Sequence, residues 1–223
     1  MNNVKKTIGW ADYTWNPIVG CKNNCFYCYA KKIHGRFSDR RFSDIHLYSY
    51  RLEEPYRKKK GAKIFVCSMS DFFGDGVSIQ ERYPVYRVIK DNPQHTFQLL
   101  TKKPGNITGE DFHYLEMFDN IWLGSTLATK QDYLNNYFVN KPSISVKSFI
   151  SFEPLMFNPN MSKIYADWFI IGAMTGLGSA KYKPEKEWIE NIVYWAKVGN
   201  RPVFMKDSIK PYWDGELLKE FPK

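Results

Sequence analysis

"KIFVCSMSD", residues 63–71, is a short apolar run that ends in a polar cluster. Short continuous apolar runs are typical of strands buried on both faces of a parallel sheet. The stretch that follows, "SIQERYPVYRVIKDN" (78–92), places Ser78 and Glu81 at the spacing of a capping box. Pro84 is expected to interrupt a regular helix there. Residues 63–92 therefore predict one strand–helix unit.

The same unit recurs along the chain. The other apolar runs are "YTWNPIVGC" (13–21), "TFQLLTKKP" (96–104), "IWLGSTLAT" (121–129), "KSFISFEPL" (147–155), "DWFIIGAMTG" (167–176) and "PVFMKDSIK" (202–210). A further helix is predicted in 183–200, between Pro184 and Gly199, whereas 155–167 is too short for a full crossover helix. The pattern predicts one α/β domain over 1–223, a partial (βα)6–7 TIM-like barrel with parallel strands.

Composition and charge narrow the class of protein. The 223 residues are 43% hydrophobic and 17% aromatic, enough for a sizeable core. Neither a signal peptide nor a membrane span is recognisable, which predicts a soluble cytoplasmic protein with reduced thiols and no membrane contact. The net charge of +9 and the basic segments 31–41 and 57–63 predict a nucleic-acid or nucleotide partner. A solvated basic face without a partner is the alternative.

Polar residues follow most of the predicted strands. Active sites of βα barrels lie where strands end in loops, so these residues are candidates for a site. They include Ser68, Ser70 and Asp71 after one strand, Ser125 at the end of another, and Glu153 after a third. Asp71 and Glu153 could equally anchor loops by capping helices. Cys67, inside an apolar run, is either a small core residue or a reactive thiol.

"GCKNNCFYCYA" (20–30) carries the strongest chemical signal, because Cys21, Cys25 and Cys28 have the spacing C-x3-C-x2-C. Zinc would need a fourth ligand. The candidates for that ligand are Cys67, His34, His46, His95 and His113. An iron–sulfur cluster could instead use three thiolates and leave one iron open. The position after the first strand favours the cluster, and Tyr27 offers an aromatic face beside the last cysteine.

This triad resembles that of the radical S-adenosylmethionine superfamily. "TWNPIVGC", the triad, "SMSD", "LLTKKP", "SFEPL" and "VFMK" together resemble a phage- and prophage-associated family of radical-SAM-like proteins, from about residue 7 onward. The resemblance implies a [4Fe-4S] cluster on the triad, and S-adenosyl-L-methionine cleaved reductively to a 5′-deoxyadenosyl radical. The sequence departs from the superfamily in lacking a GGE-type segment and in having Met174 where a glutamate is expected.

The resemblance also assigns residue roles. Tyr27, Ser68, Ser70, Asp71 and Ser125 are predicted to bind the cofactor, and Cys67 and Glu153 are the candidate catalytic residues. The predicted enzyme modifies or repairs nucleic acid or a nucleotide and needs a reducing electron donor. The alternative function is a non-catalytic nucleic-acid-binding protein stabilised by zinc or an iron–sulfur cluster.

Overall fold

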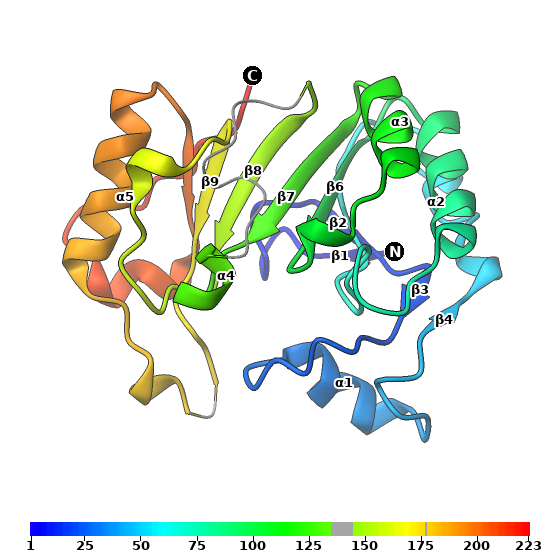
Figure 1. Ribbon diagram of the computed structural model, residues 1–223, viewed down its shortest axis with the longest axis horizontal. Helices are drawn as coiled ribbons and strands as arrows, with labels where there is room; N and C mark the ends of the chain where they lie inside the picture. Colours follow the sequence, from blue (N-terminus) through cyan, green and yellow to red (C-terminus); the bar gives the residue numbers. More distant parts are fainter. Residues whose placement is uncertain (135–144, 177) are drawn as a thin grey trace. The chain divides into compact units, whose positions relative to one another are not determined.

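A computed structural model describes residues 1–134, 145–176 and 178–223. The chain divides into two compact units, Met1–Leu123 and Gly124–Lys223, and each unit is described by itself. Figure 1 labels the helices and strands along the chain. The single domain expected over 1–223 stays a prediction.

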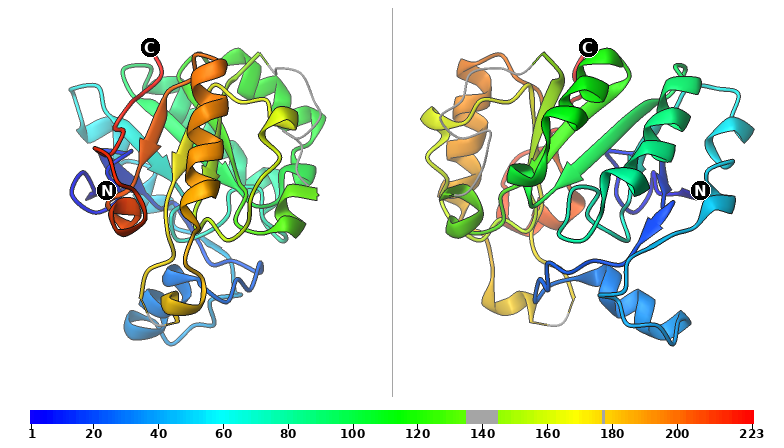
Figure 2. Two further views of the ribbon diagram at one scale, coloured as in Figure 1. Left: turned by 90° about the vertical axis from the view of Figure 1, so that its left-hand side faces the viewer. Right: turned by 45° about the vertical axis from the view of Figure 1, so that its right-hand side comes forward.

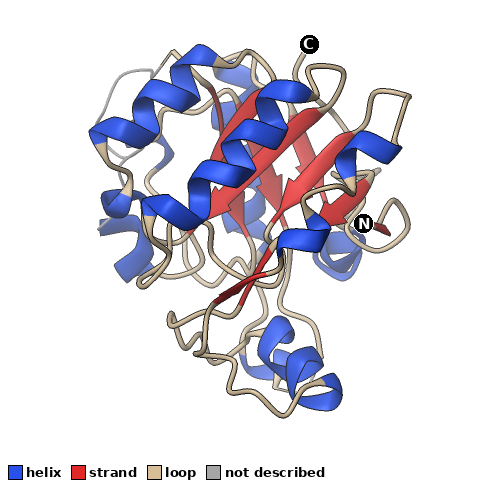
Figure 3. Cartoon of the chain, turned by 90° about the vertical axis from the view of Figure 1, so that its right-hand side faces the viewer, coloured by secondary structure: helices blue, strands red, loops and turns tan. Residues whose placement is uncertain are grey.

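The first unit contains most of the strands. They are β1 (Asn2–Asn3), β2 (Tyr13–Trp15), β3 (Ile18–Val19), β4 (His46–Leu47), β5 (Lys63–Val66), β6 (Thr96–Thr101) and the start of β7 (Ile121–Thr126). Parallel ladders join β2 to β5 and β5 to β6, and β7 is the next neighbour of β6. β1 adds an antiparallel edge to β2. β3 and β4 form a separate antiparallel ladder, which Figure 3 shows between the parallel strands and α1.

The helices of this unit begin at side-chain caps. They are α1 (Tyr29–Phe37), α2 (Ile79–Asp91) and α3 (Gly109–Met117), with short 3-10 turns at Ser49–Arg51, Pro55–Arg57 and Pro104–Asn106. The predicted capping box of α2 is confirmed, because Glu81 N–H donates to Ser78 Oγ and the Glu81 carboxylate accepts from Ser78 N–H. The expected interruption at Pro84 is wrong. α2 runs through Pro84, since its buried face, including Val85 and Ile89, holds the helix despite one missing N–H.

Large aromatic side chains fill the core of the first unit. Trp15 of β2 lies 5.8 Å from Phe97 of β6 between ring centroids, and both are fully buried. Trp10 packs 4.8 Å from the ring of Phe65 on β5. Helices α2 and α3 are in contact through the stacked rings of Tyr86 and Tyr114.

Helix α1 lies apart from strands β5 and β6 in both views of Figure 2.

The second unit continues the strand–helix alternation. Its elements are the end of β7, α4 (Lys130–Leu134), β8 (Lys147–Phe152), β9 (Trp168–Ile171), α5 (Lys186–Val198) and β10 (Val203–Met205), with 3-10 turns at Met161–Lys163, Ser179–Lys181 and Asp207–Tyr212. Parallel ladders join β8 to β9 and β9 to β10. α5 ends at Gly199 as predicted, and the segment 155–167 holds only a 3-10 turn, also as predicted.

Close packing in the second unit explains a glycine inside β7. A Cβ built on Gly124 would lie 2.3 Å from Cζ of Phe149, which is fully buried on β8. Phe149 in turn packs 5.6 Å from Trp168 of β9. Only glycine leaves room for the Phe149 ring at this position, so the β7–β8 contact is specified by one small residue.

Together these elements make a mixed α/β fold with mostly parallel strands. Each of the seven predicted apolar runs contains a strand within the described residues. The alternation of strands and helices is thus confirmed, whereas the TIM-like barrel stays a prediction. Among the described residues, no helix has both the length and the apolar character needed to cross a bilayer.

Candidate functional site

Residues 20–30, here called the cysteine segment, are hydrogen-bonded to the loop that follows β5. Ser70 Oγ donates to the carbonyl of Gly20 at 2.5 Å, and Gly20 N–H donates to the carbonyl of Met69 at 3.0 Å. Gly20 has a φ of +105°, and a Cβ there would lie 2.7 Å from the carbonyl oxygen of Asp44. Glycine is therefore required where the chain enters the cysteine segment.

Asp71 joins three segments of the first unit. Its side chain, 5% exposed, accepts four hydrogen bonds. The donors are Asn23 Nδ2 at 2.7 Å, Thr101 Oγ1 at 2.6 Å, Lys102 N–H at 2.9 Å and Phe73 N–H at 3.2 Å. One carboxylate thus holds together the cysteine segment, the loop after β5 and the end of β6. Asp71 therefore anchors loops without capping a helix, since the next helix, α2, has Ser78 as its N-cap.

Ser68 also makes contacts within the protein. Its hydroxyl donates to Asn16 Oδ1 at 3.1 Å, and the same Asn16 oxygen accepts from Met69 N–H at 2.9 Å. Its carbonyl accepts from the hydroxyl of Tyr29 at 2.8 Å. Asn16 thus fixes the loop that Ser68 belongs to.

Tyr27 faces a lysine at the end of β6. Lys102 Nζ donates to the Tyr27 hydroxyl at 3.0 Å and lies 5.1 Å from the ring centroid. The ring of Phe26 meets Tyr27 edge to face at 5.0 Å. The predicted aromatic face beside the last cysteine is therefore part of a Tyr–Lys contact.

The four cysteines are all thiols in different surroundings. Burial raises the pKa of Cys21 to about 11, with smaller contributions from Asp71 and from the other two thiols of the segment. Cys28 is the N-cap of α1, where its Sγ accepts from Lys31 N–H at 3.3 Å. Cys67 is buried with a φ of +59°, and burial raises its pKa to about 12, so it belongs to the core.

These surroundings overturn the predicted cofactors. Across residues 1–134, 145–176 and 178–223, no group of three or more His, Cys, Asp and Glu side chains is arranged to hold a metal ion. The prediction of a [4Fe-4S] cluster on Cys21, Cys25 and Cys28 is therefore wrong. The predicted S-adenosyl-L-methionine site is wrong as well, because it depended on an open iron of that cluster. The zinc alternative lacks a ligand group in the same residues.

The remaining predicted site residues, Ser125 and Glu153, lie in the second unit. Ser125 is fully buried at the end of β7. Glu153 forms a half-buried ion pair with Lys206, and both side chains approach Gly172 so closely that a Cβ there would touch them. In the first unit the structure brings together Tyr27, Ser68, Ser70 and Asp71, which support the cysteine segment, whereas Glu153 and Lys206 hold strand ends of the second unit.

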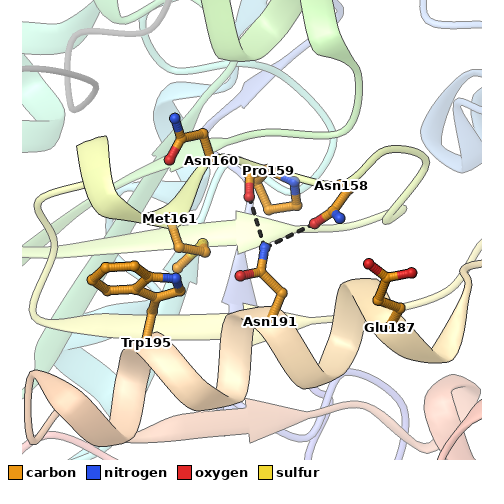
Figure 4. Close-up of a pocket in the computed structure, with 7 residues that line it drawn as sticks. All are labelled: Asn158, Pro159, Asn160, Met161, Glu187, Asn191 and Trp195. Carbon is orange, nitrogen blue, oxygen red and sulfur yellow. Dashed lines mark hydrogen bonds between the residues drawn. The ribbon is translucent and has the colours of Figure 1, made fainter.

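The second unit also has an open pocket of about 380 Å³ that sequence reasoning missed. Figure 4 shows Asn191 of α5 donating to Asn158 Oδ1 at 2.8 Å and to the carbonyl of Pro159 at 2.9 Å. Trp195 and Glu187 flank it on the same helix. Asn158 and Asn191 are hydrogen-bonded to each other, and none of the predicted site residues lines the pocket.

Four exposed large side chains of the first unit gather on α1 and the turn before it. Phe26, Tyr29, Ile33 and Phe37, here called the α1 face, are 57%, 52%, 41% and 84% exposed. The spacing of four residues puts Tyr29, Ile33 and Phe37 on one side of α1, while Ala30 and His34 are buried. Phe26 lies on the turn before the helix. This spacing of apolar residues is visible in the sequence and is the signal that could have identified the α1 face.

A protein-family model described as "Protein of unknown function (DUF5131)" matches residues 5–211. No curated protein and no solved structure matches the chain. The matched range covers most of the chain and includes the cysteine segment and α1.

Proposed function

We propose that this chain, which belongs to the DUF5131 family, binds single-stranded nucleic acid on the α1 face of its first unit. The exposure of two aromatic rings on α1 and of a third on the turn before it is the observation that carries the proposal. Exposed rings of this kind are costly in water and are typical of surfaces on which bases stack.

The charge around the rings favours a polyanion. Residues 22–44 contain six lysines and arginines but only two aspartates. Lys32 and Arg36, which lie between Tyr29 and Phe37 in the sequence, are exposed on α1 itself. Phosphates bound by these cations would release counterions, while the bases stack on the rings. This combination of aromatic and basic groups suits a single strand, whose bases are free to stack.

The helix is held in place before any ligand arrives. Tyr29 is tied by its hydroxyl to the Ser68 carbonyl, Cys28 caps the helix, and Asn23 is bonded to Asp71. A surface that is already ordered loses less conformational entropy on binding. The contacts at the cysteine segment thus support the binding surface in the proposed function.

Fluorescence anisotropy with a labelled single-stranded oligonucleotide tests the proposal. Phe37→Ala is expected to weaken binding roughly 5- to 150-fold, since a stacked base is worth about 1–3 kcal/mol. Tyr194→Ala, which removes an exposed ring from α5 in the second unit, is the matched control and should leave affinity unchanged.

A salt titration tests the phosphate contacts separately. Lys32→Gln is expected to reduce the slope of log affinity against log salt by about 0.7, the contribution of one phosphate on a single strand. Lys197→Gln, an exposed lysine of α5, is its control. An oligonucleotide affinity that does not change with salt concentration would contradict the proposal. Equal affinity for duplex and single strand would contradict it as well.

The finer expectations from sequence accompany this proposal as predictions. The mostly parallel strands support a partial βα barrel, and the finding on membrane-crossing helices is compatible with a cytoplasmic protein. Enzymatic modification of the bound nucleic acid also stays a prediction. Binding itself requires neither a metal nor a cofactor and stands independently of that chemistry.

A further inference from the structure

Cys25 and Cys28 occupy the two ends of a tight turn. Cys28 N–H donates to the Cys25 carbonyl at 3.1 Å, with Phe26 and Tyr27 in the central positions. A β-turn brings its first and fourth Cα atoms within about 7 Å of each other. Disulfides typically join cysteines whose Cα atoms are about 4.4–6.8 Å apart. The backbone therefore already brings these two cysteines near bonding range.

The other two thiols are worse placed for such a bond. Cys67 is buried at the end of β5, out of reach of an exchange partner. Cys21 is half-exposed like Cys25 and Cys28, but it lies outside the turn that brings those two together. Cys25 and Cys28 are both half-exposed, so a small disulfide reagent can approach them.

Contacts on both sides hold the turn in place. Asn23 is bonded to Asp71 on one side, and Tyr29 is bonded to the Ser68 carbonyl on the other. Tyr27, inside the turn, is held by Lys102. A bond between the two sulfurs would thus form within a segment already fixed, and it would close a ring too short to restrict the unfolded chain strongly. Such a bond is readily reversible.

We propose that Cys25 and Cys28 form a thiol–disulfide redox pair that reacts with low-molecular-weight disulfides such as oxidised glutathione. One thiolate attacks a glutathione sulfur and releases one glutathione thiolate, giving a mixed disulfide. The second cysteine then attacks the protein sulfur and releases the other glutathione. Both cysteine S–H bonds are lost and one S–S bond forms, while glutathione disulfide takes up the two electrons and two protons.

Tryptic mapping of the oxidised full-length chain tests the pair directly. The reduced protein is treated with excess oxidised glutathione, quenched with acid, alkylated with iodoacetamide and digested. Cleavage after Lys22 and Lys31 yields peptide 23–31, which contains Cys25 and Cys28 but neither other cysteine. The expected product is this peptide without alkyl groups and lighter than the dithiol form by two hydrogen atoms. Dithiothreitol should restore it to the doubly alkylated form.

Variants identify the partners. Cys21→Ser should leave the yield of the Cys25–Cys28 bond unchanged, whereas Cys25→Ser should abolish it and leave a glutathione adduct on Cys28. A link between peptides 7–22 and 23–31 would overturn the proposal, because it would show that Cys21 is the partner. Mixed glutathione disulfides alone on the wild-type chain would overturn it as well. The wild-type map needs no variant to fold, and it is independent of nucleic-acid binding.

Discussion

Replacing Asp71 with asparagine should destabilise the first unit by an amount that its hydrogen bonds set. The carboxylate accepts from Asn23 and Lys102 at one oxygen and from Phe73 and Thr101 at the other. Asparagine has the same shape but only one acceptor oxygen, so in either orientation its NH₂ group faces two donors. Asn23 can flip its amide to offer Oδ1, and the Thr101 hydroxyl can accept on its second lone pair. In either orientation one backbone donor, Lys102 N–H or Phe73 N–H, therefore loses its acceptor, at about 1–3 kcal/mol.

The expected loss is therefore about 2 kcal/mol, or a fall in melting temperature of roughly 4–8 °C for a chain of this size. Urea unfolding followed by tryptophan fluorescence measures the free energy. Asp75→Asn, at an exposed carboxylate paired with Lys103, is the control and should change it by less than about 1 kcal/mol. If Asp71→Asn behaves like this control, the assigned network is wrong.

Three further changes probe other parts of the fold. Arg82→Met should lower the free energy of unfolding in urea by about 3–5 kcal/mol, because it leaves the fully buried Asp111 carboxylate without its ion-pair partner. The double variant Arg82→Met/Asp111→Leu should recover part of this loss. If it recovers none, an unpaired charge is not the cause. Cys67 loses its proton near pH 9.0 when unfolded but only near 12 when folded, so stability should fall across that window by up to about 1.4 kcal/mol per pH unit. Cys67→Ala should flatten the alkaline slope by this amount, and an unchanged slope would refute the assignment. Gly124→Ala should destabilise the chain by about 1–3 kcal/mol through its clash with Phe149, and adding Phe149→Leu should relieve it; a neutral Gly124→Ala would contradict the close packing.

The strands were predictable because their signal is local. Runs such as "KIFVC" and "WFII" carry β-branched and aromatic residues in unbroken series, and each formed a strand. Pro84 misled the helix prediction because its local cost was weighed without the tertiary packing of Val85 and Ile89.

The site was less predictable, because its contacts are not local. Asp71 was recognised as a polar strand-end residue, but its partners Asn23 and Thr101 lie 48 and 30 positions away. The cysteine spacing fixed how far apart the thiols are along the chain, not where their sulfurs point. The turn at Cys25 and the cap at Cys28 set those directions, and no metal-holding group results among the described residues.

The sulfur cap of α1 has a practical consequence for anyone who labels this protein. In most helices the N-cap acceptor is an oxygen, which does not react with maleimides or iodoacetamide. In α1 the N-cap acceptor is Cys28 Sγ, which does. A dye attached to that sulfur would change the acceptor of Lys31 N–H and disturb the turn that carries Tyr29. Fluorophores for binding measurements are therefore better attached to the oligonucleotide, and thiol-reactive reagents should be kept out of preparations meant to report on α1.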